Sequence, residues 1–259
     1  MKTSRLKNIV IVILLLVNAF LLFLLLSRRA QERVEQLCTL FEKNGVAFDR
    51  ALLPDEEAHL SLSLERDAAR EEAFASALLG TAESSDSGGG VSRFTGEYGS
   101  CSIRSGGTVD ALLSRPVDDP ESFSKQLFKT FGYTFLTSQL TDGSGSVTGM
   151  RSEKGQLIFN ASLTLTFSDS SLTGVSGTFL PALDEGRRTD GLDAVDALVH
   201  FLDYCSVSGV VCTEVRALDE GYLLQTSSAS PLRLQGVWRI STDVSSYYVN
   251  CKTGEITRE

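Results

Sequence analysis

Residues 9–26, IVIVILLLVNAFLLFLLL, determine how the rest of this 259-residue chain is organised. The run holds eighteen consecutive residues, and Asn18 alone is polar. As a helix it would be ~27 Å long, about the thickness of the hydrocarbon core of a bilayer. The sequence therefore predicts a transmembrane helix over residues 9–26, with a short cytoplasmic segment before it at residues 1–8.

A cleaved signal peptide is the alternative interpretation of this run. Such a peptide has an apolar core of roughly 7–15 residues, followed by a small and neutral cleavage site. Here the core is longer, and the next residues are Ser27, Arg28 and Arg29, which are polar or basic. We therefore expect an uncleaved, single-pass anchor in the cell membrane.

Basic residues lie on both sides of the apolar run, so the orientation of the helix in the membrane is predicted from a small difference in positive charge between the two sides. Residues 1–8 add the terminal amine to their three basic side chains, and this favours a cytoplasmic N-terminus. The large C-terminal domain is then extracytoplasmic. The basic residues counted are Lys2, Arg5 and Lys7 before the run, and Arg28, Arg29 and Arg33 after it.

Asn18 lies in the middle of the apolar run. Its amide is either tolerated by an otherwise very apolar helix, or it hydrogen-bonds another membrane helix, which is worth ~0.5–2 kcal/mol. Both interpretations stay open at the level of sequence.

Charge restricts the partners of the domain. Residues 28–259 hold 21 basic and 33 acidic side chains, a net charge of −12. An acidic domain is repelled by nucleic acid and by anionic lipid headgroups. We therefore expect neither nucleic acid nor anionic lipid headgroups to be partners of this domain.

The five cysteines show no CxxC pair, so neither a zinc site nor a thioredoxin-like site is predicted. One interpretation is that all five are small, buried, apolar thiols. The other is a disulfide among the last three, which their spacing does not decide. The five are Cys38, Cys101, Cys205, Cys212 and Cys251.

Beyond the anchor, the pattern predicts an α+β ectodomain built from two helix-on-antiparallel-sheet units. Residues 27–115 read as a membrane-proximal region of helix and strands, residues 116–181 as the first unit and residues 190–259 as the second. Each unit starts with an amphipathic helix and continues in strands, and residues 156–168 alternate between apolar and polar side chains. One helix on a curved antiparallel sheet, used twice, is the economical architecture.

Smaller local predictions fall within residues 27–115. We expect a short strand over residues 46–53, a helix over 68–79, a flexible turn over 84–90 and a β-hairpin over 91–115.

Motifs of enzymes and of cofactor sites are missing from the sequence. It holds no GxSxG, HExxH, P-loop or GxGxxG pattern. Its two histidines are His59, in an acidic loop, and His200, within a helical pattern. We therefore expect no catalytic, cofactor or metal site. An unrecognised envelope hydrolase that uses the two histidines is the remaining enzymatic alternative.

Three aromatic residues near the C-terminus are candidates for a partner surface. Trp238 lies in a predicted strand, where its ring either packs in the core or contacts a partner protein. Tyr247 and Tyr248 are neighbours on another strand, so their side chains face opposite sides of it. We expect at least one of these tyrosines to be exposed.

Three stretches together carry a family resemblance. The N-terminus, MKTSRLKNIVIVILLLVNAFLLFLLL, resembles the "KxxxIxIxxLLLxNxFLL" anchor of the YycI and YycH family of membrane-bound two-component regulators, with Asn18 at the polar position of that anchor. The segment VEQLCTLFEKNGVAFDRALLP is similar to the segment that follows the anchor in that family. The ending VWRISTDVSSYYVNCKTGEI resembles the close of a PepSY-type unit.

The resemblance implies a non-enzymatic protein with a cytoplasmic N-terminus and an extracytoplasmic α+β domain. Family members pair with a paralogous regulatory protein and restrain a sensor histidine kinase through contacts between membrane helices. This chain departs from the common pattern because it lacks a tryptophan near its N-terminus and has five cysteines. The alternative function is a PepSY-like binding or inhibitory module for an envelope hydrolase.

Overall fold

The computed structural model describes the backbone of residues 2–54, 60–86, 88–153, 155–182, 187–188, 191–227 and 230–259. Within these ranges the side chains are described except at residues 2–10, 25–27, 30, 60–63, 86, 187–188, 227 and 230–231. The described chain is an α+β protein with a large, mainly antiparallel sheet, which confirms the predicted fold class at that level.

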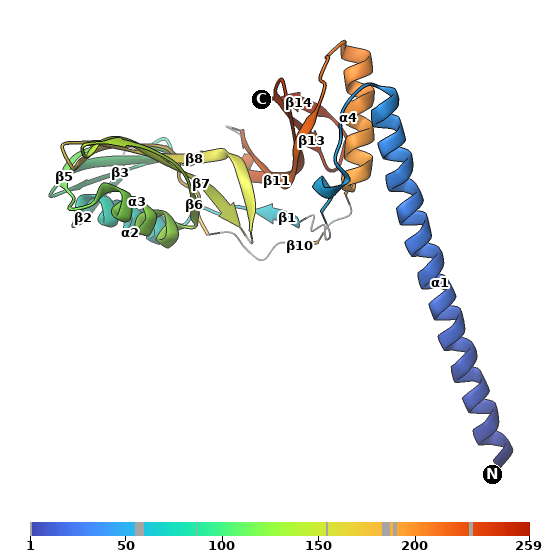
Figure 1. Ribbon diagram of the computed structural model, residues 1–259. Coiled ribbons are helices and arrows are strands. Elements are labelled where there is room, and N and C mark those ends of the chain that lie inside the picture. The colour runs from blue at the N-terminus through green and yellow to red at the C-terminus, as the bar shows by residue number, and fades with distance from the viewer. Residues whose placement is uncertain are drawn as a thin grey trace.

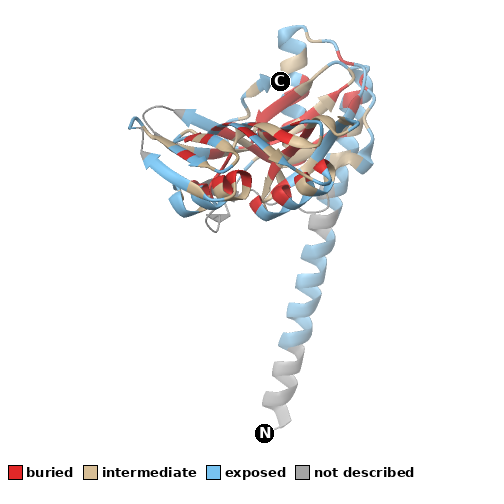
Figure 2. Cartoon of the chain, turned by 90° about the vertical axis from the view of Figure 1, so that its left-hand side faces the viewer, coloured by how far each residue is buried: buried red, intermediate tan, exposed pale blue. Residues whose placement is uncertain are grey.

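The longest element is helix α1 (Lys2–Lys43), which runs without a break away from the rest of the molecule (Figure 1). Its C-terminal part packs beside the domain, and its N-terminal part projects free of it (Figure 2). The large apolar side chains between Ile11 and Leu24 are 47–66% exposed.

Among the side chains that the structure describes, no helix offers an apolar stretch long enough to cross a membrane.

Three shorter helices begin and end with the expected capping residues. In each, an aspartate accepts hydrogen bonds from backbone N–H groups of the first turn, and a glycine follows the last turn. The predicted helix over residues 68–79 is confirmed. The helices are α2 (Ala68–Leu79, Asp67 and Gly80), α3 (Pro120–Phe131, Asp119 and Gly132) and α4 (Ala194–Ser208, Asp193 and Gly209).

Fourteen strands in the described residues join in one sheet, whose main path is β10-β1-β12-β11-β8-β9-β5-β4-β3-β2. Strands β6 and β7 extend from β8, and strands β13 and β14 extend from β12. The strands are β1 (Leu60–Ser63), β2 (Ala82–Asp86), β3 (Val91–Gly96), β4 (Gly99–Arg104), β5 (Thr108–Pro116), β6 (Tyr133–Thr141), β7 (Ser144–Glu153), β8 (Gln156–Ser168), β9 (Ser171–Thr178), β10 (Arg187–Arg188), β11 (Val215–Ser227), β12 (Ser230–Thr242), β13 (Ser246–Asn250) and β14 (Ile256–Arg258).

Two large cores lie at opposite ends of this sheet. The first forms where α2 and α3 cover one face of strands β3 to β9 (Figure 1), and Phe74 is central to it, stacked on Phe179 at 4.2 Å between ring centroids. The second forms around α4, strands β11 to β13 and the C-terminal part of α1. The first core draws on residues 74–113 as well as on residues 127–179.

The two ends are joined by β8 and β11, the one parallel pair among the named strands of the described chain. Gly221 of β11 lies opposite Leu157 of β8, and a side chain at Gly221 would overlap the Leu157 carbonyl and the Phe159 ring. Glycine is therefore required where these two strands approach each other closely.

Some local predictions are wrong. Residues 46–53 do not form a strand, because the Asp49 carboxylate accepts a hydrogen bond from the Ala51 N–H and begins a short 3₁₀-helix, η1 (Arg50–Leu52). The turn expected over 84–90 begins later, since β2 occupies residues as far as Asp86. The hairpin over 91–115 is a three-stranded meander, because a second turn lies at Glu97 and Tyr98.

Candidate functional site: the junction of α1 and α4

Arg33 connects α1 to the start of α4. Its guanidinium donates to both carboxylate oxygens of Asp193, with N···O distances of 2.9 and 3.3 Å, and to Asp196 at 2.8 Å. The hydrogen bond to Asp193 is the main reason that the Arg33 pKa is raised. A planar guanidinium that engages two carboxylates fixes the direction of approach as well as the contact.

Asp193 has two tasks at this point. It is the N-cap of α4, where its Oδ1 accepts the Asp196 N–H at 2.8 Å, and it is also the principal partner of Arg33. Arg33 therefore binds the N-terminal end of α4, where the helix dipole favours the negative charge of Asp193.

Leu192, the residue before Asp193, is held in place by hydrogen bonds to two residues of the core around α4. The Leu192 carbonyl accepts the indole N–H of Trp238 at 2.8 Å, and the Leu192 N–H donates to the Cys251 carbonyl at 2.7 Å. The start of α4 is thus fixed by buried groups on one side and by Arg33 of α1 on the other.

Apolar packing continues the junction along α1. Leu37 and Phe41 lie one and two turns beyond Arg33, and they are 2% and 1% exposed. They belong to the same buried cluster as the α4 residues Ala194, Ala197, Leu198, Phe201 and Leu202. Burial of two large side chains contributes several kcal/mol, roughly 1.5–3 kcal/mol for each, so this packing and not the ion pair supplies most of the attachment energy.

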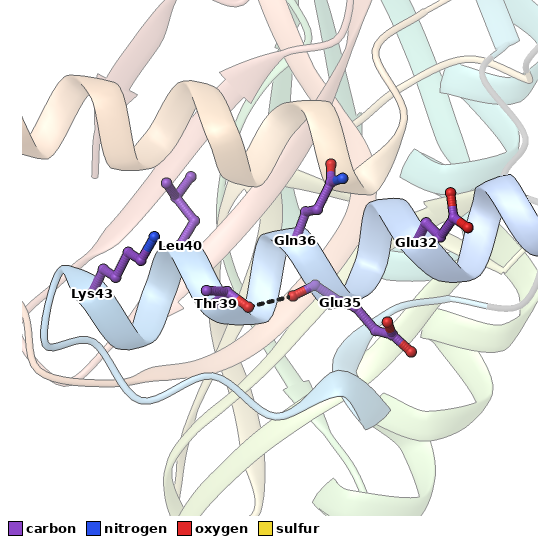
Figure 3. A pocket seen from close by; sticks show the side chains of 6 residues that line it. All are labelled: Glu32, Glu35, Gln36, Thr39, Leu40 and Lys43. Atoms are coloured by element: carbon purple, nitrogen blue, oxygen red, sulfur yellow. Dashed lines mark hydrogen bonds between the residues drawn. The ribbon is translucent and has the colours of Figure 1, made fainter.

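A groove follows the outer side of this junction. Figure 3 shows Gln36 and Leu40 directed toward α4, while Glu35 points away from it. The neighbouring stretch of the groove is lined by Arg33, Val195 and Val199. Leu40 and Val199 are 38% and 42% exposed, so the groove presents apolar carbons with both acidic and basic groups around them.

The structure places the three predicted surface aromatics in the interior. Trp238 and Tyr247 are 0% exposed and Tyr248 is 7% exposed, so the expectation that one tyrosine is exposed is wrong. Both faces of β13 are covered. Tyr247 packs on Phe201 of α4, with ring centroids 5.2 Å apart, and Tyr248 packs on Phe159 of β8 at 5.5 Å. Trp238 is therefore a core ring, the other interpretation that the sequence allowed.

The remaining predicted positions lie apart from one another. Asn18 donates its amide to the Leu14 carbonyl of the same helix at 2.9 Å. His200 is exposed on α4, with its ring against Gly254. His59 falls outside the described residues. No group of three or more His, Cys, Asp or Glu side chains within the described residues is arranged to hold a metal ion.

Burial raises the pKa of several groups near α4 and β13. It raises the pKa of Tyr248 to about 12, and the neighbouring Glu259 adds to this shift. A tyrosine of the unfolded chain ionises near pH ~10. Between these two values the unfolded state has released a proton that the folded state still holds, so stability is fully present below pH ~10 and falls as the pH rises toward 12. Burial also raises the pKa of Cys205 to about 12, which extends the same trend to lower pH.

We expect the free energy of unfolding, measured with urea, to decrease steadily between about pH 9 and pH 11.5. Tyr248→Phe should make the upper part of this decrease shallower because it removes one of the titrating groups. The interpretation fails if all six tyrosines of the folded protein ionise at pH 10, as seen by tyrosinate absorbance, without any loss of stability.

Sequence reasoning missed Arg33, Asp193 and Asp196. An aspartate just before a helical pattern is a recognisable N-cap, so Asp193 carried a local signal. Its pairing with Arg33 did not, because the two residues are 160 positions apart.

Comparisons with known proteins assign this chain to no family. No family model matches the sequence, and no curated protein matches it. Among solved structures, an uncharacterized protein from Eubacterium rectale ATCC 33656 is similar with a TM-score of 0.40 and 9% identity, over 77% of this chain and 80% of that one. The C-terminal domain of Bacillus megaterium YpeB is similar with a TM-score of 0.38 and 13% identity, over 76% of this chain and 98% of that one.

Proposed function

We propose that this protein is a non-enzymatic, membrane-anchored regulator of a sensor histidine kinase in a two-component system. It acts through a transmembrane helix and an extracytoplasmic domain made of two PepSY-like units. The observation that carries the proposal is that one unbroken helix, α1, includes both the exposed apolar stretch and the part clamped to the domain by Arg33.

The exposed part of α1 supports the membrane location. The large apolar side chains from Ile11 to Leu24 are 47–66% exposed, and this favours an apolar surrounding, because soluble surfaces rarely carry such a continuous patch. A helix satisfies its own backbone hydrogen bonds, so it can occupy the bilayer without other partners. The slight excess of positive charge before the run supports a cytoplasmic N-terminus.

The junction supports a route for the signal. A rigid helix that enters a folded domain moves with it, so a displacement at either end is transmitted to the other. Within the membrane, the partners are the kinase and a paralogous regulatory protein, and Asn18 is the polar side chain available for a contact between helices. The groove beside α4 lies next to the same helix and is reached from outside the membrane.

Exchanging Arg33 tests this route. Leu37 and Phe41 keep α1 attached to the domain in an Arg33 variant, but the direction of approach that Arg33 fixes is lost. We therefore expect Arg33→Glu to reduce regulation of a kinase-dependent reporter, and Arg33→Lys to do so less, because it keeps the charge but loses the planar fork. The free energy of unfolding should fall by no more than ~1 kcal/mol, since Arg33 is half exposed. Asp193→Asn should retain the helix cap while weakening the clamp.

Arg216→Glu is the matched control. It reverses an exposed charge on β11 whose ion-pair partner is Glu214, so it leaves the contacts of Arg33 with α4 in place and should leave regulation unchanged. If Arg33→Glu and Arg216→Glu regulate equally well, the clamp has no part in signalling.

Truncation separates the two functional classes. A chain of residues 1–35 should keep part of the regulation if the membrane helix itself contacts the kinase. If that truncate is inert, and the full-length protein stably captures an envelope hydrolase, the PepSY-like inhibitory module is the better description.

A further inference from the structure

Arg115 of β5 is a partly buried arginine at the C-terminal end of α2. It falls on the same face of β5 as Ala111 and Leu113, the face that α2 and α3 cover. Its Nη1 donates to the carbonyls of Ala77 and Leu78, the second at 3.3 Å. Carbonyls in the last turn of a helix have no partners within the helix, so Arg115 satisfies two of those that end α2.

Two aromatic rings hold this guanidinium in place. Its Cζ lies 5.4 Å from the ring centroid of Tyr98 and 5.1 Å from that of Phe123. Such contacts with aromatic rings stabilise a planar guanidinium and restrict its orientation. The side chain of Arg115 is therefore largely fixed before any ligand arrives, so it loses little conformational freedom on binding one.

One edge of the Arg115 guanidinium remains available. Within the described part of the chain, Nε and Nη2 make no hydrogen bond or ion pair, and neither atom is fully enclosed. Two neighbouring N–H groups of a guanidinium bind a carboxylate through two parallel hydrogen bonds. Arg115 thus supports α2 with one nitrogen and leaves a carboxylate-binding edge open to solvent.

Arg115 lines a hollow of about 300 Å³ between α2 and α3. It is the single charged side chain of this lining, so the hollow is positive in a domain whose net charge is negative. Its volume is at the lower limit for small-ligand sites, so its occupant is small. The other lining residues are four apolar side chains and two exposed polar ones of α3: Ala77, Phe123, Leu127 and Phe131, then Gln126 and Thr130.

We propose that this hollow binds the C-terminal residue of a peptide chain whose last side chain is apolar. The α-carboxylate pairs with the free edge of Arg115, and the last side chain packs against Leu127 and Phe131. A terminal residue carries its carboxylate and its side chain on one carbon atom, and a single length of chain leaves the hollow. Capture of a chain-terminal carboxylate is a recurring mode of peptide recognition. This goes beyond the proposed regulatory role and does not depend on it.

The test measures peptide binding to the full-length protein in detergent by fluorescence anisotropy, with detergent alone as the blank. The probe is a fluorescein-labelled pentapeptide of glycine and serine that ends in leucine with a free carboxylate. The same peptide with a C-terminal amide should bind at least about tenfold more weakly, because it lacks the charge-assisted hydrogen bonds. A free-acid peptide that ends in glycine should lose about tenfold, because it buries no apolar side chain. An amidated peptide with an internal glutamate supplies a carboxylate from the other source and should bind as weakly as the first amide.

Variants of one exposed residue of α3 locate the binding. Gln126→Glu adds a carboxylate to the lining and should weaken binding of the leucine acid about fivefold, whereas Gln126→Lys should not weaken it. Lys129→Gln is the matched control, since it lowers the charge of α3 by the same single unit at a position outside the lining, and it should leave binding unchanged. Arg115→Lys keeps the charge but loses the fork, so it should also weaken binding. Far-UV CD of each variant confirms that the fold is retained.

Four results would overturn the proposal. The first is no binding of the leucine acid at concentrations up to about 1 mM. The second is equal binding of the acid and its amide. The third is equally strong binding of the peptide with an internal glutamate, which would show that a chain end is not what the hollow selects. The fourth is an equal effect of Gln126→Glu and Lys129→Gln, which would place the binding elsewhere. The kinase reporter plays no part in these readouts, so a failed regulatory proposal leaves them unaffected.

Discussion

Gly132→Ala should lower the free energy of unfolding by ~3–5 kcal/mol, one of the largest effects of a single methyl group in this protein. Gly132 ends α3 with a φ of +75°, and a Cβ at this position would overlap the Arg151 guanidinium. Arg151 is 3% exposed, and its Nη1 donates to the Phe131 carbonyl at 2.6 Å. The methyl group would displace a buried charge from its hydrogen bond, and that loss is added to the strain of the left-handed backbone.

Gly209→Ala is the matched control because it separates these two costs. Gly209 ends α4 in the same left-handed conformation, with a φ of +72°, but nothing lies within 4 Å of its missing side chain. It should cost only ~1 kcal/mol, the strain alone. Urea unfolding of the two variants, followed by far-UV CD, measures the difference. Equal losses would show that Arg151 does not occupy the space beside Gly132.

Trp238→Ala should be equally damaging, with a loss of ~3–5 kcal/mol, because it opens a large cavity in the core around α4. It also removes the indole N–H that holds the Leu192 carbonyl, and with it the support for the start of α4. Trp238→Phe keeps most of the volume and loses the hydrogen bond, so a loss of ~1–2 kcal/mol is expected. Hydrogen exchange should show the faster opening concentrated in α4 and in strands β11 to β13.

Val211→Ala is the control for this pair. Val211 is 78% exposed on the segment between α4 and β11, so its truncation should change stability by less than ~0.5 kcal/mol. If the Trp238→Ala protein is as stable as the wild type, Trp238 is not a core residue. It would then again be a candidate for contacts with a partner.

Local patterns were enough to predict several of the regular elements. Pro120 and Glu121 in the first turn of α3 are typical of a helix start, and the alternation of apolar side chains predicts β8. These signals are local because capping and alternation depend on neighbours in the chain. The misplaced strand at residues 46–53 had an apolar pattern too, but a single aspartate hydrogen bond decided the backbone there.

The contacts that make the candidate site are not local. Arg33 and Asp193 come together because α1 packs on α4. The sequence around Asp193 indicates a helix N-cap and the sequence around Arg33 an ordinary surface charge, but neither indicates that the two residues pair. The two tyrosines of β13 were expected to divide between core and solvent, as on a sheet with one covered face. They are both buried because each face of β13 is covered. Helix α4 covers one face, and the Phe159 ring of β8 covers the other, since β8 pairs with β11 beside β12 and β13.

Membrane topology in intact cells tests the central claim most directly. Val244 is 55% exposed in the turn between β12 and β13, so a cysteine placed there is open to a maleimide reagent that does not cross membranes. Both variants are made in a chain whose five native cysteines are replaced by alanine, because these thiols are free. The account predicts that full-length Val244→Cys protein sediments with membranes and is labelled from outside, while Thr3→Cys is labelled only after the cells are permeabilised. Protein that is found free of the membrane, or Val244→Cys that is labelled only after permeabilisation, would contradict it.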